Sequence, residues 1–340
     1  MFKVGFATGR TQDDGRSNWA GDGCRPLAWT AWYPTEDVPD RHAGSDQAVG
    51  PSPLFPQSVM PGARLAGRQE IYPVVLLSHG TGGTAASLGW LGCRLAKAGF
   101  VSIGVDHHGN TASQDYRPEG FLCWWERARD LIVLLDHHLV AGPFAGRLDE
   151  TLVFAAGFSL GAHGVLPLLG ASTQMSLFLD AAGGMPWRHG PREFPDVGDQ
   201  VGRLLDTSAV FRASWTRQNA SYRDQRIKAA LLCAPGPDVR GLTVESLAEI
   251  EAPVAIASVG ADREAPADLC AAWLHAHLRD STMEMLDPMA GHYAFLSECS
   301  DWGRVHEPAI CIDSPGIDRR WIHDRAAALA IGLFSEGAVG

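Results

Sequence analysis

The sequence lacks several features that would assign it to a special class. No apolar run reaches the ~18 uninterrupted residues that suggest a membrane-spanning helix, and residues 1–11 lack the long apolar stretch of a signal peptide. Positive charge is also scarce, because 28 Lys and Arg residues stand against 39 Asp and Glu residues, a formal net charge of −11. This balance, without Lys or Arg runs, disfavours a nucleic-acid partner. We therefore expect a cytoplasmic protein without stable membrane insertion.

Metal-binding patterns are missing as well. The seven cysteines never occur as CxxC, so they predict neither a zinc site nor a disulfide framework. Most should be buried thiols, with a pair such as Cys270 and Cys299 as the alternative. Neighbouring histidines at 107–108 and 137–138 project to different sides of a strand or helix, so neither pair forms a chelating face. We expect no metal and no other cofactor.

What the sequence does contain is an alternation of short apolar runs and longer amphipathic segments from residue 71 onward. This alternation predicts βαβ units, and hence an α/β fold with a mostly parallel central sheet and helices on both faces. Such folds often exceed 200 residues as one unit, so residues 1–340 are expected to form a single domain. The expected strands are 73–78, 100–105, 152–156, 229–233, 254–258 and 282–286. The expected helices are 87–98, 124–139, 160–169, 265–278 and 318–333.

Two regions fall outside this alternation. Before residue 71 only 27–33 shows clear strand alternation, and the Pro- and Gly-rich residues 34–67 predict a long loop. A second irregular block, 180–226, lies between two expected strands. It contains aromatic residues, Trp187 and Phe211 among them, that cannot join the core formed by the expected strands and helices. We expect this block to be a cap or lid over the carboxyl edge of the sheet.

A candidate nucleophile follows the strand at 152–156. Residues 157–161 read GFSLG, which matches G-x-S-x-G, and a helical segment begins directly after them. This strand–turn–helix setting is what a nucleophile elbow requires, with Ser159 exposed on a sharp turn. The N–H of Leu160 would then face a developing oxyanion. The alternative is a helix that merely starts with Gly and Ser and carries no chemistry.

A glycine-rich turn, HGTGG at 79–83, follows the expected strand at 73–78. At this position a turn can present a second backbone N–H to the same oxyanion, and Thr81 is the predicted donor. No lysine follows as in GxxxxGK[ST], so a phosphate-binding loop is disfavoured. A plain tight turn is the alternative.

The remaining partners of a triad come from loops further along the chain. Asp262 follows the strand at 254–258, and His292 follows the strand at 282–286. The order Ser, Asp, His is the one expected for this fold class, with His292 as base and Asp262 as the acid that orients it. Two other acids stay open. Asp180 would qualify if 175–179 were a strand, and Asp238 follows the strand at 229–233.

Together these residues resemble the α/β-hydrolase superfamily over roughly residues 70–335. Further segments resemble the predicted dienelactone-hydrolase-like proteins related to platelet-activating-factor acetylhydrolases. These segments are RPL at 25–27, WYP at 32–34, SHG at 78–80, VDH at 105–107, GNT at 109–111, WERARD at 125–130, GHY at 291–293, FL at 295–296 and Cys299. The resemblance implies a serine-dependent hydrolase of carboxylic esters without a cofactor. Two departures matter: true dienelactone hydrolases use a cysteine where this chain has Ser159, and acetylhydrolase-like members carry the acid after the sixth strand.

Our leading hypothesis is therefore an esterase that forms an acyl-enzyme on Ser159, acting on a small molecule with an apolar acyl or alcohol group. Lactone or amide hydrolysis, or acyl transfer, would use the same residues. A hypothesis of another class is a catalytically silent binding protein on the same scaffold.

Overall fold

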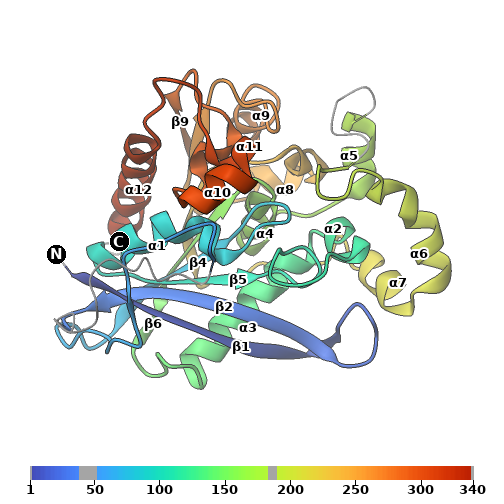
Figure 1. The fold of residues 1–340 in the computed structure, drawn as a ribbon. Coiled ribbons are helices and arrows are strands. Elements are labelled where there is room, and N and C mark those ends of the chain that lie inside the picture. The colour runs from blue at the N-terminus through green and yellow to red at the C-terminus, as the bar shows by residue number, and fades with distance from the viewer. Residues whose placement is uncertain (1, 38–51, 183–189, 338–340) are drawn as a thin grey trace.

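A computed structural model describes residues 2–37, 52–182 and 190–337. The described residues form one nine-stranded sheet with the order β3-β1-β2-β5-β4-β6-β7-β8-β9. Helices lie on both sides of it (Figure 1). This is the α/β architecture that the sequence predicts.

Six neighbouring strands of this sheet are parallel, and they correspond to the six expected from the sequence. Most of their residues are buried, as expected of strands that helices cover on both faces. Their bounds are Tyr72–Ser78 (β4), Val101–Asp106 (β5), Leu148–Phe158 (β6), Ile227–Cys233 (β7), Val254–Val259 (β8) and Ser281–Asp287 (β9).

The helices divide between the two faces of the sheet and bury one apolar cluster on each. On one face lie α3 (Glu126–Val140), α4 (Leu160–Leu169), α8 (Val244–Ala248) and α9 (Ala271–His277). On the other lie α1 (Gly89–Ala98) and α12 (Arg319–Glu336). The helix expected over 265–278 is shorter, because residues 267–270 form turns before α9 begins. Among the described helices, none is long and apolar enough to cross a bilayer.

The N-terminal region contains a long strand that sequence alternation did not reveal. β1 (Lys3–Ser17) pairs antiparallel with β2 (Cys24–Thr35), so the prediction of a single strand before residue 71 was wrong. Two glycines in β1 hide its pattern. A Cβ on Gly5 would lie 2.2 Å from the ring of Tyr33, and one on Gly9 would lie 2.3 Å from the ring of Trp29. The glycines therefore leave room for aromatic rings of the paired strand.

The predicted loop at 34–67 contains a short strand, β3 (Met60–Pro61), which pairs with β1. Residues 38–51 of that loop lie outside the described residues. Tyr33 fixes its later part by donating a hydrogen bond from its hydroxyl to the carbonyl of Ala63 at 2.7 Å.

The block at 180–226 is largely helical where it is described. α5 (Met175–Ala182) leads into it, and α6 (Val201–Thr207) and α7 (Ala209–Trp215) follow at one side of the molecule (Figure 1). Residues 183–189, with Trp187, lie outside the described residues. Phe211 and its neighbours pack with Trp125 in a third cluster, apart from the two on the sheet. Residues 175–179 are helical, so the strand that would have supported Asp180 is absent there.

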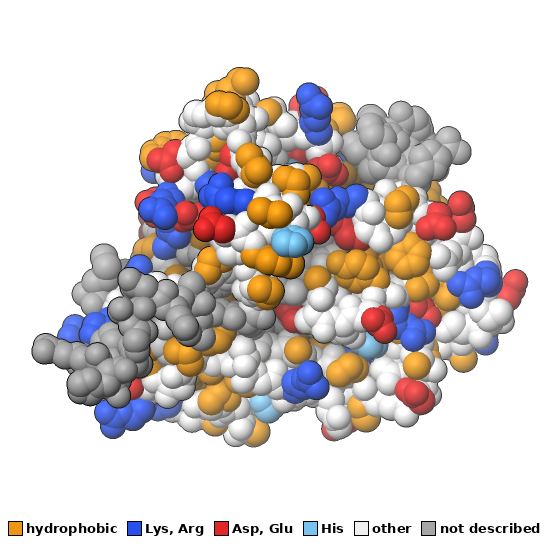
Figure 2. Space-filling model, in the orientation of Figure 1, with side chains coloured by type: hydrophobic (Ala, Val, Ile, Leu, Met, Phe, Trp, Pro, Cys, Tyr) orange, Lys and Arg blue, Asp and Glu red, His pale blue; other side chains and the backbone are white. Residues whose placement is uncertain are grey.

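The C-terminal region carries a disulfide between Cys299 and Cys311, and not the alternative pair of Cys270 and Cys299. That pairing was wrong for a topological reason: Cys270 is buried on the α9 face of the sheet and Cys299 on the opposite face. The remaining helices are α2 (Pro118–Leu122), α10 (Asp301–His306) and α11 (Pro308–Cys311). Figure 2 shows hydrophobic side chains gathered over α10 and α11, where Trp302 and Val305 are exposed.

Candidate active site

Ser159 lies on a strained turn between β6 and α4. Its φ of 53° is in the left-handed region that non-glycine residues rarely occupy. The two glycines of the motif make this turn possible. A Cβ on Gly157 would lie 2.3 Å from the carbonyl oxygen of Gly161, and one on Gly161 would lie 2.0 Å from that of Ser78. The turn therefore has the geometry of a nucleophile elbow.

The structure brings Ser159, His292 and Asp262 together, although 133 residues separate the first two. His292 begins a short 3-10 helix (His292–Phe295) after β9, and its Nε2 lies 2.9 Å from Ser159 Oγ. Its Nδ1 lies 2.7 Å from Oδ2 of Asp262, which follows β8. Asp262 and His292 are each 6 % exposed, so little solvent competes for their hydrogen bond.

The Asp262 carboxylate is held in place by its own loop. Its Oδ1 accepts hydrogen bonds from the backbone N–H groups of Glu264 and Ala265 at 3.0 and 2.7 Å, which leaves Oδ2 for His292. A carboxylate fixed in this way selects the imidazole tautomer with the proton on Nδ1. Nε2 can then accept the proton of the Ser159 hydroxyl when the oxygen attacks a carbonyl carbon.

The turn at 79–83 lies directly beside Ser159. A Cβ on Gly80 would come within 3.2 Å of Ser159 Cβ, and the N–H of Gly82 donates to Asn110 Oδ1 at 2.6 Å. Within the described part of the chain, the N–H of Thr81 has no hydrogen-bond acceptor. Leu160 is the first residue of α4, where a backbone N–H has no intrahelical partner. These two N–H groups are therefore the candidate donors of an oxyanion hole.

The two alternative acids lie elsewhere. Asp180 is exposed on α5, so its candidacy was wrong. Asp238 is buried, and its nearest charged or titratable neighbour at salt-bridge distance is His163, 3.6 Å from its Oδ2. That oxygen has no hydrogen-bond partner in the described residues. Burial raises the pKa of Asp238 to about 7 and lowers that of His163 to about 4. Asp262 is therefore the carboxylate placed to orient His292.

Charged residues of the irregular block reach the edge of the site, which no sequence motif indicated. Glu193 packs its Cγ close to Gly82, where a Cβ would lie only 2.7 Å away. Arg192 forms an ion pair with Glu307 at 3.0 Å, beyond the loop that carries His292. Burial raises the pKa of Glu193, which Arg192 opposes. Residues 192–193 thus span from the glycine-rich turn toward the loop of His292.

The histidine clusters serve other contacts. His107 bonds to Ser78 and Asp130, and His108 bonds to Gln114. His138 packs edge-on against Trp29 with ring centroids 4.6 Å apart. Across the described ranges, no group of three or more His, Cys, Asp or Glu side chains is arranged to hold a metal ion.

Part of the chain is similar to a family of known proteins. Residues 66–205 match the family described as PET hydrolase-like. Cutinase est1 of Thermobifida alba is 32 % identical over 143 residues, which cover 41 % of this chain and 44 % of that protein. Cutinase 2 of Thermobifida cellulosilytica is 33 % identical over 99 residues, 28 % of this chain and 34 % of that protein. The matches thus span less than half the length of these curated relatives.

A solved structure extends the similarity to nearly the whole chain. A ferulic acid esterase from Streptomyces cinnamoneus superposes with a TM-score of 0.59 at 17 % identity, over 98 % of this chain and 90 % of that chain. At this identity the likeness concerns the fold. With the parallel sheet and the elbow after β6, these similarities confirm the fold class that the sequence predicted. The chain therefore has the α/β-hydrolase fold, and its residues 66–205 match the PET hydrolase-like family.

Proposed function

We propose that this protein hydrolyses carboxylic esters through an acyl-enzyme on Ser159. The observation that carries this proposal is the hydrogen-bonded series from Asp262 through His292 to Ser159, with contacts of 2.7 and 2.9 Å. The base can take the proton of the attacking hydroxyl and return it to the leaving alcohol, and water then repeats the step on the acyl-enzyme. The N–H groups of Thr81 and Leu160 stabilise the oxyanion in both halves of the reaction.

The similarity to cutinases and the fold shared with a ferulic acid esterase support an ester as the substrate. We propose a small ester whose acyl or alcohol part is apolar. Aromatic residues at the side of the site favour this choice: Tyr116 and Phe194 both pack against Phe121, with ring centroids 5.2 and 5.6 Å from it. Tyr116 also donates from its hydroxyl to the carbonyl of Gly82 at 2.8 Å, which brings these rings close to the glycine-rich turn.

A fluorophosphonate probe tests the nucleophile directly. The wild-type protein should be labelled and should hydrolyse short p-nitrophenyl esters, and Ser159→Ala should do neither. A matched control is Ser281→Ala, because Ser281 also pairs with a histidine, His275, at 2.8 Å but lies on the edge strand β9. That variant should be labelled like the wild type. Labelling of Ser159→Ala at the wild-type rate would refute the assignment.

A panel of esters, lactones and amides would define the reaction further. We expect the highest kcat/KM on an uncharged ester.

A cytoplasmic location is a separate proposal. The bond between Cys299 and Cys311 counts against this location, because disulfides are rare in reducing compartments. Titration of free thiols in protein taken directly from cells would test it.

A further inference from the structure

The molecule contains a second series of Asp, His and Ser that none of the assignments above uses. Asp130 Oδ2 lies 2.8 Å from His107 Nδ1, and His107 Nε2 lies 2.9 Å from Ser78 Oγ. The connectivity is that of Asp262, His292 and Ser159. All three side chains are buried: Ser78 is 0 %, His107 2 % and Asp130 3 % exposed. No substrate can reach this serine, so the series must serve another purpose.

Its position indicates that purpose. Ser78 is the last residue of β4, directly before the turn that carries Thr81. The backbone N–H of His107 donates to Nε2 of His79 at 3.1 Å, and Nδ1 of His79 is 2.6 Å from the carbonyl oxygen of Gly80. Both imidazoles thus contact the backbone or side chains of residues 78–80, which lead into the oxyanion donor.

A further side chain, Arg127, also contacts this turn. Its Nη1 donates to the carbonyl oxygen of His79 at 2.5 Å, and the side chain is buried. Burial lowers the pKa of Arg127 to about 9, which the carboxylates of Asp238 and Asp130 oppose. Burial lowers the pKa of His107 to about 4, so this ring is neutral at pH 7. A neutral His107 with its proton on Nδ1 can donate to Asp130 and accept from Ser78.

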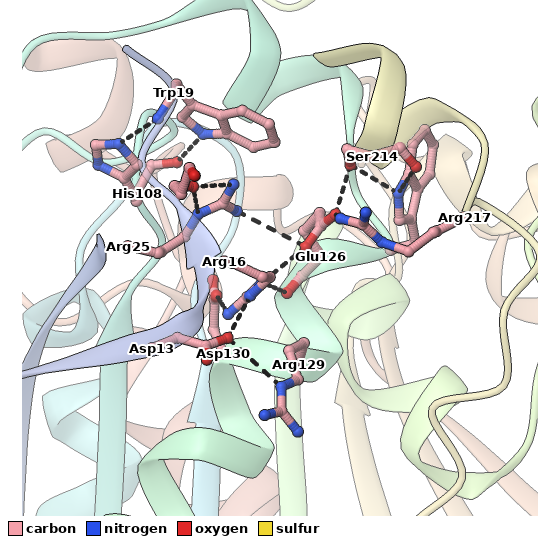
Figure 3. Close-up of polar contacts among 12 residues, drawn as sticks. Asp13, Arg16, Trp19, Arg25, His108, Glu126, Arg129, Asp130, Ser214 and Arg217 are labelled. Atoms are coloured by element: carbon pink, nitrogen blue, oxygen red, sulfur yellow. Dashed lines mark hydrogen bonds and ion pairs between the residues drawn. The ribbon is translucent and has the colours of Figure 1, made fainter. Parts of the chain in front are cut away.

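The carboxylate of Asp130 connects this series to a larger buried network (Figure 3). Arg16 donates to Asp130 Oδ1 at 2.6 Å and to Glu126 Oε2 at 2.8 Å. The other oxygen of Glu126 accepts from Ser214 Oγ at 2.5 Å and from Arg217 Nη2 at 2.9 Å. Burial alone would raise the pKa of Asp130, but Arg16 and His107 hold it well below the usual range. Hydrogen bonds therefore run from α7 in the irregular block to the turn beside Ser159.

We propose that this network fixes the backbone of residues 79–81 in the position needed for transition-state stabilisation, with Ser78, His107, Asp130 and Arg127 as positioning residues. The proposal rests on the proposed function, since the oxyanion forms only during acyl transfer. Fixed donors cost no reorganisation when charge develops on the substrate. The buried ions are then retained for placement of the turn, since buried ion pairs are weak contributors to stability.

Ser78→Ala tests the proposal with the smallest change, because it removes one oxygen and leaves Nε2 of His107 without its partner. With an uncharged p-nitrophenyl ester we expect kcat to fall by about tenfold and KM to stay within about twofold, less than the loss of a whole donor. Phosphonylation of Ser159 by the fluorophosphonate probe should slow in the same proportion. The pH profile should keep its shape, since His292 and Asp262 are untouched.

Arg127 offers a graded test. Arg127→Met removes the donor to the carbonyl of His79, whereas Arg127→Lys keeps a cationic donor at the same place. We expect Arg127→Lys to retain clearly more of the wild-type kcat than Arg127→Met. The matched control is Thr173→Val, because Thr173 Oγ1 forms a buried hydroxyl–histidine contact of 2.9 Å with His163 that does not involve the turn. It should lower the melting temperature as much as Ser78→Ala and leave kcat unchanged.

The outcomes separate this proposal from the proposed function. An inactive, unlabelled wild-type protein would refute the esterase assignment itself. An active wild type whose folded Ser78→Ala and Arg127→Met variants keep the wild-type kcat would overturn the positioning role alone. So would an equal fall of kcat in Thr173→Val. If the buried variants do not fold, Arg217→Gln tests the exposed end of the network, where we expect a two- to threefold lower kcat at unchanged KM and an unchanged kcat would count against the proposal.

Discussion

Replacing Asp262 by asparagine should remove most of the activity without removing the fold. In the native protein Oδ1 of Asp262 accepts two backbone hydrogen bonds, from Glu264 and Ala265, and Oδ2 faces Nδ1 of His292. An asparagine keeps its oxygen on the two N–H groups, because its NH₂ cannot accept from them. The NH₂ then faces His292, which must move its proton to Nε2. In that tautomer Nε2 cannot accept the proton of the Ser159 hydroxyl.

The magnitude follows from this tautomer switch. The same change in a Ser-His-Asp protease lowers kcat by about 10⁴ with its geometry intact, which corresponds to about 5 kcal/mol in the activation barrier. We expect a loss of this order in Asp262→Asn, measured as kcat on an uncharged p-nitrophenyl ester near pH 7.5. The melting temperature should change little, since the two backbone hydrogen bonds remain.

Asp238→Asn is the matched control for this experiment. Asp238 is also a buried aspartate after a central strand, but it contacts His163 and not His292. The kcat of Asp238→Asn should stay within about threefold of the wild-type value. If Asp262→Asn retained kcat within tenfold while Asp238→Asn lost it, the reasoning from hydrogen-bond geometry would be refuted, and the acid would lie after β7.

Two further predictions concern charge. Burial raises the pKa of Asp238 to about 7, above its ordinary 3.8, so the native state holds this proton over a range where the unfolded chain has released it. The free energy of unfolding should therefore fall between about pH 4 and pH 7, by at most about 4 kcal/mol, and urea titrations at several pH values should show a smaller fall in Asp238→Asn. The carboxylate of Glu193 beside Gly82 should disfavour anionic substrates. Glu193→Gln should raise kcat/KM for an ester with a free carboxylate about fivefold relative to a neutral ester, from about 1 kcal/mol of repulsion. An unchanged ratio at low salt would show that Glu193 does not face the bound substrate.

The sequence predicted the parallel part of the sheet because this part is encoded locally. Each of the six parallel strands is a short apolar run between turn residues, and the longer helices α1, α3, α4 and α12 show their period over ten or more residues. The elbow is local in the same sense, since Gly157, Ser159 and Gly161 all lie within one turn. The chain order of Ser159, Asp262 and His292 was enough to nominate a triad, because parallel strands bring their carboxyl ends to one edge.

The features that the sequence did not reveal depend on residues far apart in the chain. β1 is a strand because Gly5 and Gly9 accommodate rings of β2, a cross-strand contact without a periodic signature. Residues 175–179 have an apolar composition that suits either a strand or a helix. They form a helix because they pack against the cluster around Trp125. Cys299 pairs with Cys311 because the sheet separates it from Cys270.

The same distinction applies to the site. Residue types and spacing determined which serine, histidine and aspartates were candidates, since glycines around a serine are a local steric requirement. Only the tertiary structure decided that Asp262 and not Asp238 orients His292, because hydrogen bonding depends on direction and distance between loops that are far apart in the chain. Only the tertiary structure showed that Ser78, His107 and Asp130 form a buried series behind the glycine-rich turn, since burial is a property of the packed molecule.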